Sequence, residues 1–376
     1  MTDPVYLDHA ATTPLRPQAR EAMLDVLSRR WGNPSSVHRW GREARAALED
    51  ARARFAALIG AEPAEIVFTR GGTEADNLAV LGRARAVAGP LACSAIEHRA
   101  VLAAARAAGS DRLRIVPVDE NGVVDADALA GVLREGTPAL VSVMWASNEV
   151  GAVQPVEHVA GLCAEAGAAF HSDAVQALGK VPVRVDRVRV DLLSFSAHKL
   201  GGPRGAGVLF ARRGTRLHPL LFGGGQERGL RPGTEDVASA VAFTVAAELA
   251  EAEREQAMAR AAALRDRLEA GLCERIPGLR INAAATQRLP TISNLSVPGA
   301  DPEMLLMALD LEGIAASSGS ACSSGAVEPS HVLLAMGLPA ELAGPSVRFS
   351  LGRDTTQQEI DRVLEIFPRV VERVRT

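Results

Sequence analysis

The stretch DLLSFSAHKLGG, residues 191–202, guides the interpretation of the rest of the chain. Its first six residues have the character of a buried strand, and Lys199 follows just beyond them. Ligands of open α/β sheets bind at the ends of the strands. Ser196 and His198 can donate hydrogen bonds to a phosphate there. The stretch therefore predicts a ligand site, the alternative being a lysine on a surface loop.

Short apolar strands alternate with helices over the first 234 residues. We expect helices at 16–30 and at 41–59, the second ending at Gly60. Continuous apolar strands separated by helices indicate a mostly parallel sheet covered on both faces, in an α/β domain. The strand-like runs are EIVFT (65–69), LACS (91–94), RIVPV (114–118), LVSVM (140–144), AAFHSD (168–173), DLLSFS (191–196) and GVLFA (207–211).

A long helical stretch, residues 235–275, follows with Thr234 as a possible N-cap. It is more than twice as long as a usual helix, so we expect two helices or one bent helix that joins two domains. The pattern beyond it indicates a smaller α+β domain, with strands near 291–297 and 346–351 and with helices at 302–313 and from about 357.

Composition restricts the class of protein. The 376 residues, 47% hydrophobic and 23% charged, are typical of a packed globular protein with two domains or one large domain and a cap. The net charge of −4 argues against binding nucleic acid. No apolar run reaches the roughly 18 residues of a membrane span, and the first residues lack a signal-peptide pattern. We therefore expect no membrane association and a cytoplasmic location.

Lysine is scarce in this chain. Of 41 basic residues, only Lys180 and Lys199 are lysines, and the other 39 are arginines. Where a generic cation is sufficient, this sequence uses arginine, so a lysine can mark chemistry that arginine cannot perform. Schiff-base formation is the clearest such chemistry, because a guanidinium does not deprotonate. The alternative is that two lysines survived by chance.

Further polar residues stand where predicted strands end. Asp173 would pair well with a pyridinium N–H, as in sites for pyridoxal 5′-phosphate (PLP), or would simply cap the next helix. Gln176 would lie one helical turn later. The glycines at 71–72 and Thr73 open a helix, where backbone N–H groups bind phosphate. His98 could stack on a planar cofactor or move protons, or merely begin a helix.

The four cysteines form no CxxC pair, so we expect neither a disulfide framework nor a structural zinc site. Cys322 lies in ASSGSACSSG, where small residues predict a mobile loop that suits a nucleophile. A linker cysteine without a role is the alternative. Cys93, Cys163 and Cys273 lie in strand-like or helical stretches and are expected to be buried.

On these residues the chain resembles the PLP-dependent cysteine desulfurases of the class V aminotransferase superfamily. The segment around Cys322 is similar to the group with a long mobile cysteine loop, the nitrogen-fixation and iron–sulfur-cluster type. Asp236 and Ser147 depart from residues common among relatives, but neither is a proposed catalytic position. The motifs that carry the resemblance are YLDHAATT (6–13), GNPSSVH (32–38), EIVFTRGGTEADN (65–77), EH (97–98), NEVG (148–151), HSDAVQALGK (171–180), SFSAHKLGGPRGAG (194–207), GGGQERGLRPGTED (223–236), SSGSACSSG (317–325), PSHVL (329–333) and SVRFSLGR (346–353).

The resemblance implies a role for each matching residue. The catalytic residues would be Lys199, His98 and Cys322. Lys199 would hold PLP and move the substrate α-proton, and His98 would stack on the ring and assist proton transfer. Cys322 would take sulfur from L-cysteine as a persulfide, which leaves L-alanine. The other cofactor-binding residues would be Asp173 at the ring nitrogen, Gln176 at the ring oxygen, Gly72, Thr73, Ser196 and His198 at the phosphate, Asn148, and Thr234 at the partner subunit's cofactor. The substrate carboxylate would be held by Asn148 and Arg348.

The resemblance also implies the architecture and the partners. The fold would be the PLP-dependent transferase fold type I, an α/β fold whose large domain (14–258) has a mostly parallel seven-stranded sheet. The smaller α+β domain (1–13 and 259–376) would carry the cysteine loop. The enzyme would be a homodimer that passes sulfur to an acceptor protein, either an iron–sulfur scaffold or a tRNA thiolation enzyme, without binding nucleic acid itself.

Three other readings stay open on the sequence. A selenocysteine lyase or another class V aminotransferase or lyase would keep Lys199 and Asp173 but would not need Cys322 for its own substrate. A sulfur carrier without enzymatic activity would use Cys322 alone. A cysteine hydrolase would pair Cys322 with a histidine such as His331, but no local protease signature supports that.

Overall fold

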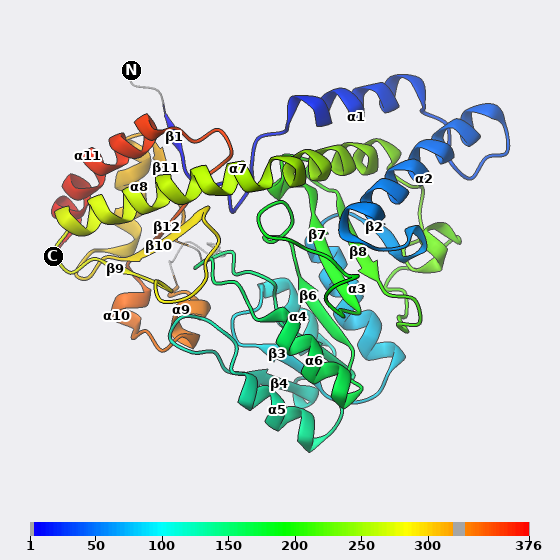
Figure 1. Ribbon diagram of the computed structural model, residues 1–376, viewed down its shortest axis with the longest axis horizontal. Helices are drawn as coiled ribbons and strands as arrows, with labels where there is room; N and C mark the ends of the chain where they lie inside the picture. Colours follow the sequence, from blue (N-terminus) through cyan, green and yellow to red (C-terminus); the bar gives the residue numbers. More distant parts are fainter. Residues whose placement is uncertain (1–3, 319–327, 376) are drawn as a thin grey trace.

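The computed structural model describes residues 4–318 and 328–375, and a sheet of seven strands forms the centre of the described chain (Figure 1). Strand β8 is antiparallel to its neighbours β2 and β7, and the remaining pairs are parallel. The mostly parallel seven-stranded sheet expected from the sequence is confirmed. In spatial order the strands are β2 (Ile66–Thr69), β8 (Gly207–Ala211), β7 (Leu192–Ser196), β6 (Phe170–Asp173), β5 (Leu140–Ser142), β3 (Leu91–Ser94) and β4 (Leu113–Val116).

Helices bury both faces of this sheet. Successive residues of a strand point to opposite faces, and in β7 Leu192 packs in one apolar cluster while Leu193 and Phe195 pack in another. The first cluster includes α3 and α4, and the second includes α2, α5 and α6. The strands are therefore apolar throughout, which explains their sequence pattern. The helices before α7 are α1 (Pro17–Arg29), α2 (Arg39–Ile59), α3 (Gly72–Ala86), α4 (Arg99–Ala107), α5 (Ala126–Glu135) and α6 (Val156–Ala166).

Helix α7 (Val237–Arg275) is one continuous helix of 39 residues that runs from the large sheet into the second region of the molecule (Figure 1). The alternative of two helices is wrong. Thr234 is not its N-cap, because the side chain of Asp236 accepts the hydrogen bond from the backbone N–H of Ser239 at 3.1 Å. Asp236 is closer to the first helical turn, where a carboxylate also meets the positive end of the helix dipole.

The second region has its own small sheets and its own core. Strand β10 (Ile292–Ser296) pairs antiparallel with β12 (Ser346–Ser350) and β9 (Arg280–Ile281), and β1 (Val5–Tyr6) pairs parallel with β11 (Ile314–Ala315). Its core holds Leu7, Phe349 and Phe367. The N-terminal strand therefore belongs with the C-terminal part of the chain. The remaining helices are α8 (Pro302–Leu311), α9 (His331–Ala335), α10 (Ala340–Ala343) and α11 (Gln357–Val374).

The sequence did not indicate β1, β9, β11, α9 or α10. Each has five residues or fewer, too short for a periodic pattern. Short 3₁₀ turns complete the described chain: η1 (Pro63–Glu65), η2 (Ser110–Arg112), η3 (Ala197–Lys199) and η4 (Gln226–Gly229). Among the described helices, none combines the length and the apolar character needed to cross a membrane.

Candidate active site

A cavity of about 250 Å³ lies where β6 and β7 end and α3 begins. The carboxyl ends of neighbouring parallel strands meet at one edge of a sheet, so polar residues that are distant in sequence gather there. The structure brings nine of the residues singled out above to this cavity. Its lining is Gly72, Thr73, Asp76, His98, Met144, Ala146, Asn148, Asp173, Val175, Gln176, Ser196, His198 and Lys199.

Two buried carboxylates form one wall of the cavity. Asp173 accepts a hydrogen bond from the backbone N–H of Val175 at 2.9 Å, in a turn rather than in the helix expected after it. Burial raises the pKa of Asp173, and burial together with the Asp173 charge raises that of Asp76 well above its usual range. Atoms of both carboxylates and of the His98 ring lie within 4.8 Å of one another. Such a carboxylate pair attracts a cationic N–H group.

A buried network of polar side chains, formed by His171, Ser142, Ser194 and Glu97, lies behind these carboxylates. The His171 ring contacts Ser142 Oγ at 2.8 Å and Ser194 Oγ at 3.0 Å, and Ser142 donates a hydrogen bond to Glu97 at 3.0 Å. Burial lowers the pKa of His171 to about 3 and raises that of Glu97 to about 8. The sequence analysis assigned no role to Glu97, His171 or Asp76, although all three lie inside the quoted motifs. For His171, a polar residue in an apolar strand was the available signal, whereas Asp76 lies in α3 and Glu97 in the loop before α4, where a polar residue does not stand out.

Lys199 lies at the end of η3, with its amine beside the N-terminal segment. Its Nζ donates to the carbonyl oxygens of Ala10 at 2.6 Å and Ala11 at 2.7 Å. Burial, and then the positive charge of Arg348, lowers the pKa of Lys199 to about 8. An amine with this pKa is partly neutral near pH 7, as a nucleophile toward an aldehyde must be.

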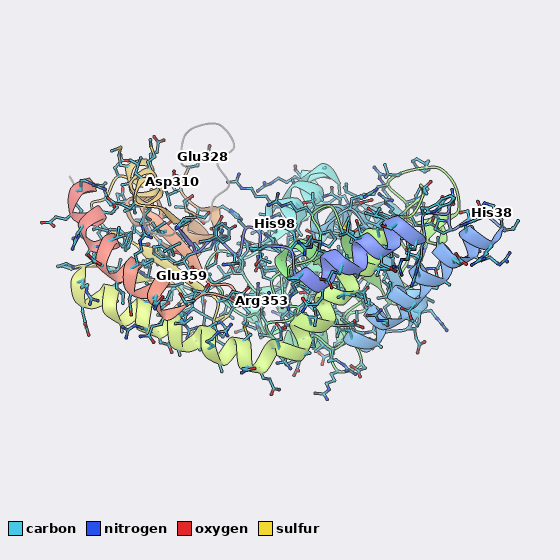
Figure 2. The ribbon with its side chains drawn as sticks, turned by 90° about the horizontal axis from the view of Figure 1, so that it is seen from above. His38, His98, Asp310, Glu328, Arg353 and Glu359 are labelled. Atoms are coloured by element: carbon cyan, nitrogen blue, oxygen red, sulfur yellow. The ribbon has the colours of Figure 1, made fainter. Side chains whose placement is uncertain are left out.

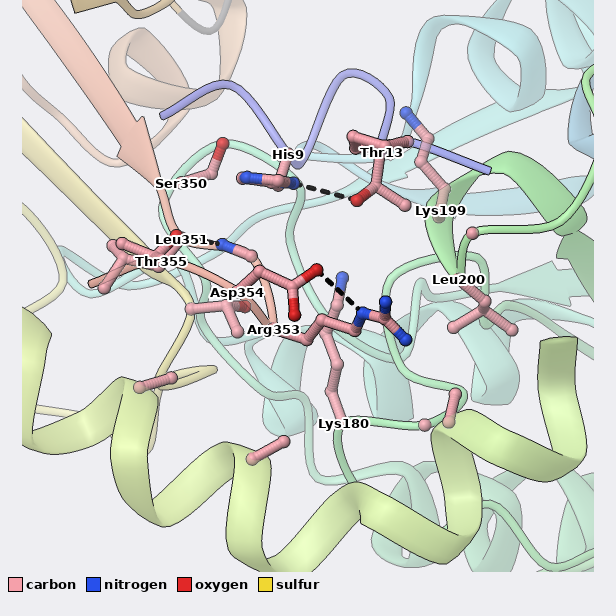
Figure 3. Close-up of a pocket in the computed structure, with 18 of the residues that line it drawn as sticks. His9, Thr13, Lys180, Lys199, Leu200, Ser350, Leu351, Arg353, Asp354 and Thr355 are labelled. Atoms are coloured by element: carbon pink, nitrogen blue, oxygen red, sulfur yellow. Dashed lines mark hydrogen bonds and ion pairs between the residues drawn. The ribbon is translucent and has the colours of Figure 1, made fainter. Parts of the chain in front are cut away.

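Lys199 also lines a second cavity, of about 300 Å³, on the other side of its side chain. Figure 3 shows this cavity with Lys180 and Lys199, the two lysines of the chain, beside Arg353 and Asp354. Seen from above, His98 and Arg353 lie in the middle of the molecule, between the end that carries His38 and the end that carries Asp310 and Glu359 (Figure 2). Lys199 lines this second cavity together with Leu200 of the large-sheet region and Ser350 of the second region, so it stands at the junction of the two regions.

The first turn of α3 offers backbone N–H groups to an anion. Gly71 has φ +138°, a backbone conformation that favours glycine, and a Cβ on Gly72 would lie 2.9 Å from the Val175 side chain. Ser196 and His198 complete this end of the cavity. Burial lowers the pKa of His198 to about 4, so its ring is neutral, and Nδ1 lies 3.2 Å from Thr12 Oγ1. This arrangement suits a phosphate.

Arg348 and Thr234 do not line the cavity. Arg348, on β12, donates from Nη1 to the carbonyl of Asn148 at 2.9 Å and from Nη2 to Asp8 at 2.7 Å. Its buried Nε has no hydrogen-bond partner within the described part of the chain. Thr234 lies exposed before α7.

Cys322 lies outside the described residues, but the chain on both sides of its segment is anchored. Ser317 exchanges backbone hydrogen bonds with Arg348, at 2.6 and 3.2 Å. On the far side, the Ser330 hydroxyl donates to Glu149, and His331 Nε2 lies 3.1 Å from the carbonyl of Glu97, the residue before His98. Both anchors therefore stand beside residues that border the cavity.

The cavity fits PLP by the chemistry of its groups. Asp76 Oδ1 is buried without a hydrogen-bond partner among residues 4–318 and 328–375, next to Asp173, and a protonated pyridine nitrogen would satisfy such a carboxylate pair. The helix N-terminus can take the phosphate, and the Lys199 amine can take the aldehyde.

The chain is an enzyme of the aminotransferase class-V family, whose model matches residues 5–363. It is 45% identical, over 99% of its length and 95% of the relative's, to the cysteine desulfurase IscS of Dictyoglomus turgidum. Among solved structures it is similar to a NifS-like protein (34% identity, TM-score 0.90, 98% and 99% of the two chains). It is also similar to SspA in complex with cysteine (32% identity, TM-score 0.80, 94% and 100% of the two chains).

Proposed function

We propose that this protein is a PLP-dependent cysteine desulfurase that converts L-cysteine to L-alanine and takes the sulfur on Cys322 as a persulfide. The observation that carries the proposal is the convergence in one cavity of the Lys199 amine, the buried Asp173 carboxylate and the first turn of α3. The relatives named above, IscS and the cysteine-bound SspA, support L-cysteine as the substrate.

PLP, when bound, supplies an electron sink that stabilises negative charge at the substrate α-carbon. The chain supplies the proton movements. The lowered pKa of Lys199 suits it to accept the α-proton near neutral pH, and its hydrogen bonds to Ala10 and Ala11 hold the amine at the cavity wall. When PLP is bound, the Asp173 carboxylate would pair with the ring nitrogen, and His98, beside it, would stack on the ring and pass a proton.

Arg348 and Asn148 would hold the substrate carboxylate. The Arg348 guanidinium already pairs with the carboxylate of Asp8, which shows that a carboxylate fits its Nη2 group. Asn148 lines the cavity, and its carbonyl fixes Nη1 of the same arginine. A substrate carboxylate would therefore take the place of Asp8 at this guanidinium.

Sulfur transfer requires a thiolate that can meet the substrate sulfur. The Cys322 thiolate would attack that sulfur, the substrate C–S bond would break, and the electron pair left on carbon would take a proton to give alanine. The anchors at Ser317 and at Ser330 and His331 support this role, because these flanking residues lie beside Arg348, which bonds to Asn148, and beside Glu97, which precedes His98.

The finer features of the proposal concern assembly and location. Exposed apolar side chains, such as Trp31 between α1 and α2, Trp40 in the first turn of α2 and Phe222 before α7, support a homodimer. Thr234, which is also exposed, would then reach the partner's cofactor. The free thiols of Cys93, Cys163 and Cys273 suit a reducing cytoplasm. Cys273 is exposed rather than buried, which corrects the expectation for that residue.

The proposal includes two domains, a large PLP-binding domain (14–258) and a small domain (1–13 and 259–376). It also includes transfer of the sulfur to an acceptor protein, either an iron–sulfur scaffold or a tRNA thiolation enzyme. The core shared by Leu7, Leu264 and Phe367 supports the second domain.

Mass spectrometry of the intact enzyme after incubation with L-cysteine, without reductant, tests the proposal. We expect an added mass of roughly 32 Da on Cys322, one sulfur atom, together with stoichiometric alanine. Alanine without the adduct would indicate a lyase that releases sulfur directly, and selenocysteine would then be tried as substrate. The absence of both products would refute the proposal.

A further inference from the structure

Lys180, the second lysine of the chain, has no part in the proposed mechanism, yet it stands beside the cofactor cavity. Its Nζ donates a hydrogen bond to Gln176 Oε1 at 2.6 Å. Gln176 Nε2 in turn donates to the carbonyl of Ala10 at 3.0 Å, the same carbonyl that accepts from Lys199 Nζ at 2.6 Å. A continuous chain of hydrogen bonds therefore links the two lysines.

The side-chain amide of Gln176 has one accepting end and one donating end. Lys180 Nζ donates to Oε1 and the Ala10 carbonyl accepts from Nε2, so the two contacts together fix which end of the amide faces Ala10 and Lys199. Without Lys180 the Oε1 end loses its partner, and the contact with Ala10 alone holds the amide. A reversed amide would place its oxygen against the Ala10 carbonyl, where two acceptors repel each other.

We propose that Lys180 is a positioning residue that holds Gln176 with its NH₂ group directed at the cofactor cavity, ready to donate to the ring oxygen of PLP. The inference rests on the proposed function only in requiring PLP as the ligand. It does not depend on the substrate or on sulfur transfer.

The surroundings of Lys180 explain why a lysine serves here. The preceding Gly179 has φ +71°, and a Cβ on it would lie 2.7 Å from Ala250 of α7, so the turn is closely packed. A slender amine enters this space more easily than a planar guanidinium. Burial, then the Lys199 and Arg348 charges, lowers the pKa of Lys180 to about 7, and the neutral amine still has hydrogens to donate to Gln176.

The charged groups around the two amines come from several elements. Asp8 and His9 belong to the N-terminal segment, Asp173 to β6 and Arg348 to β12. Arg353, Asp354, Glu359 and Glu253 also line the cavity that both lysines share. Among these charged groups, Lys180 is the one that donates a hydrogen bond to Gln176. Its effect on the Gln176 amide can therefore be separated from the effect of the other charges in the cavity.

A double-mutant cycle on PLP affinity tests the positioning role. We expect Lys180→Met to weaken PLP binding about tenfold, as for one lost hydrogen bond. In a Gln176→Leu background the same change should have no further effect, and Lys180→Arg, which keeps a donor, should recover part of the loss. Equal losses in both backgrounds, or no loss, would overturn the proposal. Arg353→Met, which removes a cation from the same cavity but none of the bonds to Gln176, is the matched control and should leave affinity unchanged.

Nuclear magnetic resonance of the apoprotein, labelled at lysine Cε, measures the lysine pKa values without any need for enzymatic activity. The chain has two lysines, so two signals are expected, and Lys180→Arg assigns them by removing one. Lys180, with a pKa of about 7, is largely neutral where Lys199 titrates, so the Lys199 pKa should change little in Lys180→Met and should fall in Lys180→Arg, which places a permanent cation there. A Lys199 pKa that does not fall in Lys180→Arg would contradict the contact between the two sites. Should Lys180→Met not fold, Lys180→Leu, which also lacks a donor, serves in both experiments.

These outcomes are separable from those of the proposed function. A wild-type protein that binds PLP but forms no alanine from L-cysteine would refute desulfuration and leave the double-mutant cycle intact. A wild-type protein that desulfurates L-cysteine, with no coupling between Lys180 and Gln176, would refute the positioning role alone.

Discussion

The two walls around Lys199 are built in different ways. One wall is local to the large sheet, where Asp173 and Ser196 stand at the ends of adjacent strands. The other comes from the second region, where Asp8 and Arg348, which are 340 residues apart, join across β12. A single sheet edge supplies the residues proposed for cofactor binding, whereas the proposed substrate end requires two distant segments to meet. Cofactor binding should therefore survive changes that disable substrate handling.

Removal of the Lys199 amine is the strongest test of the sheet wall. We expect Lys199→Ala to lower alanine production by at least about 10³-fold and to abolish the visible absorbance of the cofactor bound to lysine. Absorbance spectra and alanine assays measure the two effects. Full activity in this variant would remove Lys199 from the mechanism.

Sulfur transfer, as distinct from cofactor binding, is tested by Cys322→Ser. Sulfide release should fall by at least roughly 10²-fold, because the proposed nucleophile is lost, while the cofactor absorbance stays as in the wild type. A spectrum paired with a sulfide assay separates sulfur transfer from cofactor binding. Normal desulfuration by Cys322→Ser would show that sulfur leaves by another route.

Arg348→Lys sharpens the distinction on the substrate side. The guanidinium that donates from Nη2 to Asp8 and from Nη1 to the Asn148 carbonyl is lost, so KM for L-cysteine should rise about 10- to 100-fold, the value of a charged hydrogen bond, with PLP affinity changed little. Steady-state kinetics and PLP titration measure these effects. A large loss of PLP affinity would show that the two walls are not independent.

The pKa of Lys199 predicts how the apoenzyme captures PLP. Only the neutral amine reacts with the aldehyde, so the rate should rise about tenfold for each pH unit below a pKa of about 8 and level off above it. Stopped-flow absorbance measures the rate. Pyridoxamine phosphate, which has no aldehyde, should lack this rise, and a flat profile with PLP would contradict the lowered pKa.

The smallest expected effect concerns α7, which connects the two regions. Asp236→Ala should lower the free energy of unfolding by about 1 kcal/mol, the usual value of an N-cap, whereas Thr234→Ala should change it by less. Urea unfolding of both variants compares the two positions. The reverse order would restore Thr234 as the cap.

The sequence alone determined the large sheet, because apolar strands buried on both faces leave a strong pattern, and it pointed to Lys199 and Asp173, because polar residues at strand ends stand out from apolar surroundings. It also marked Lys180 by the scarcity of lysine, although only the structure shows its bond to Gln176. Only the tertiary structure decided that β1 pairs with β11 and that Arg348 lies beside Asp8. The segments in each contact are more than 300 residues apart, and such a contact leaves no local pattern in the sequence of either segment.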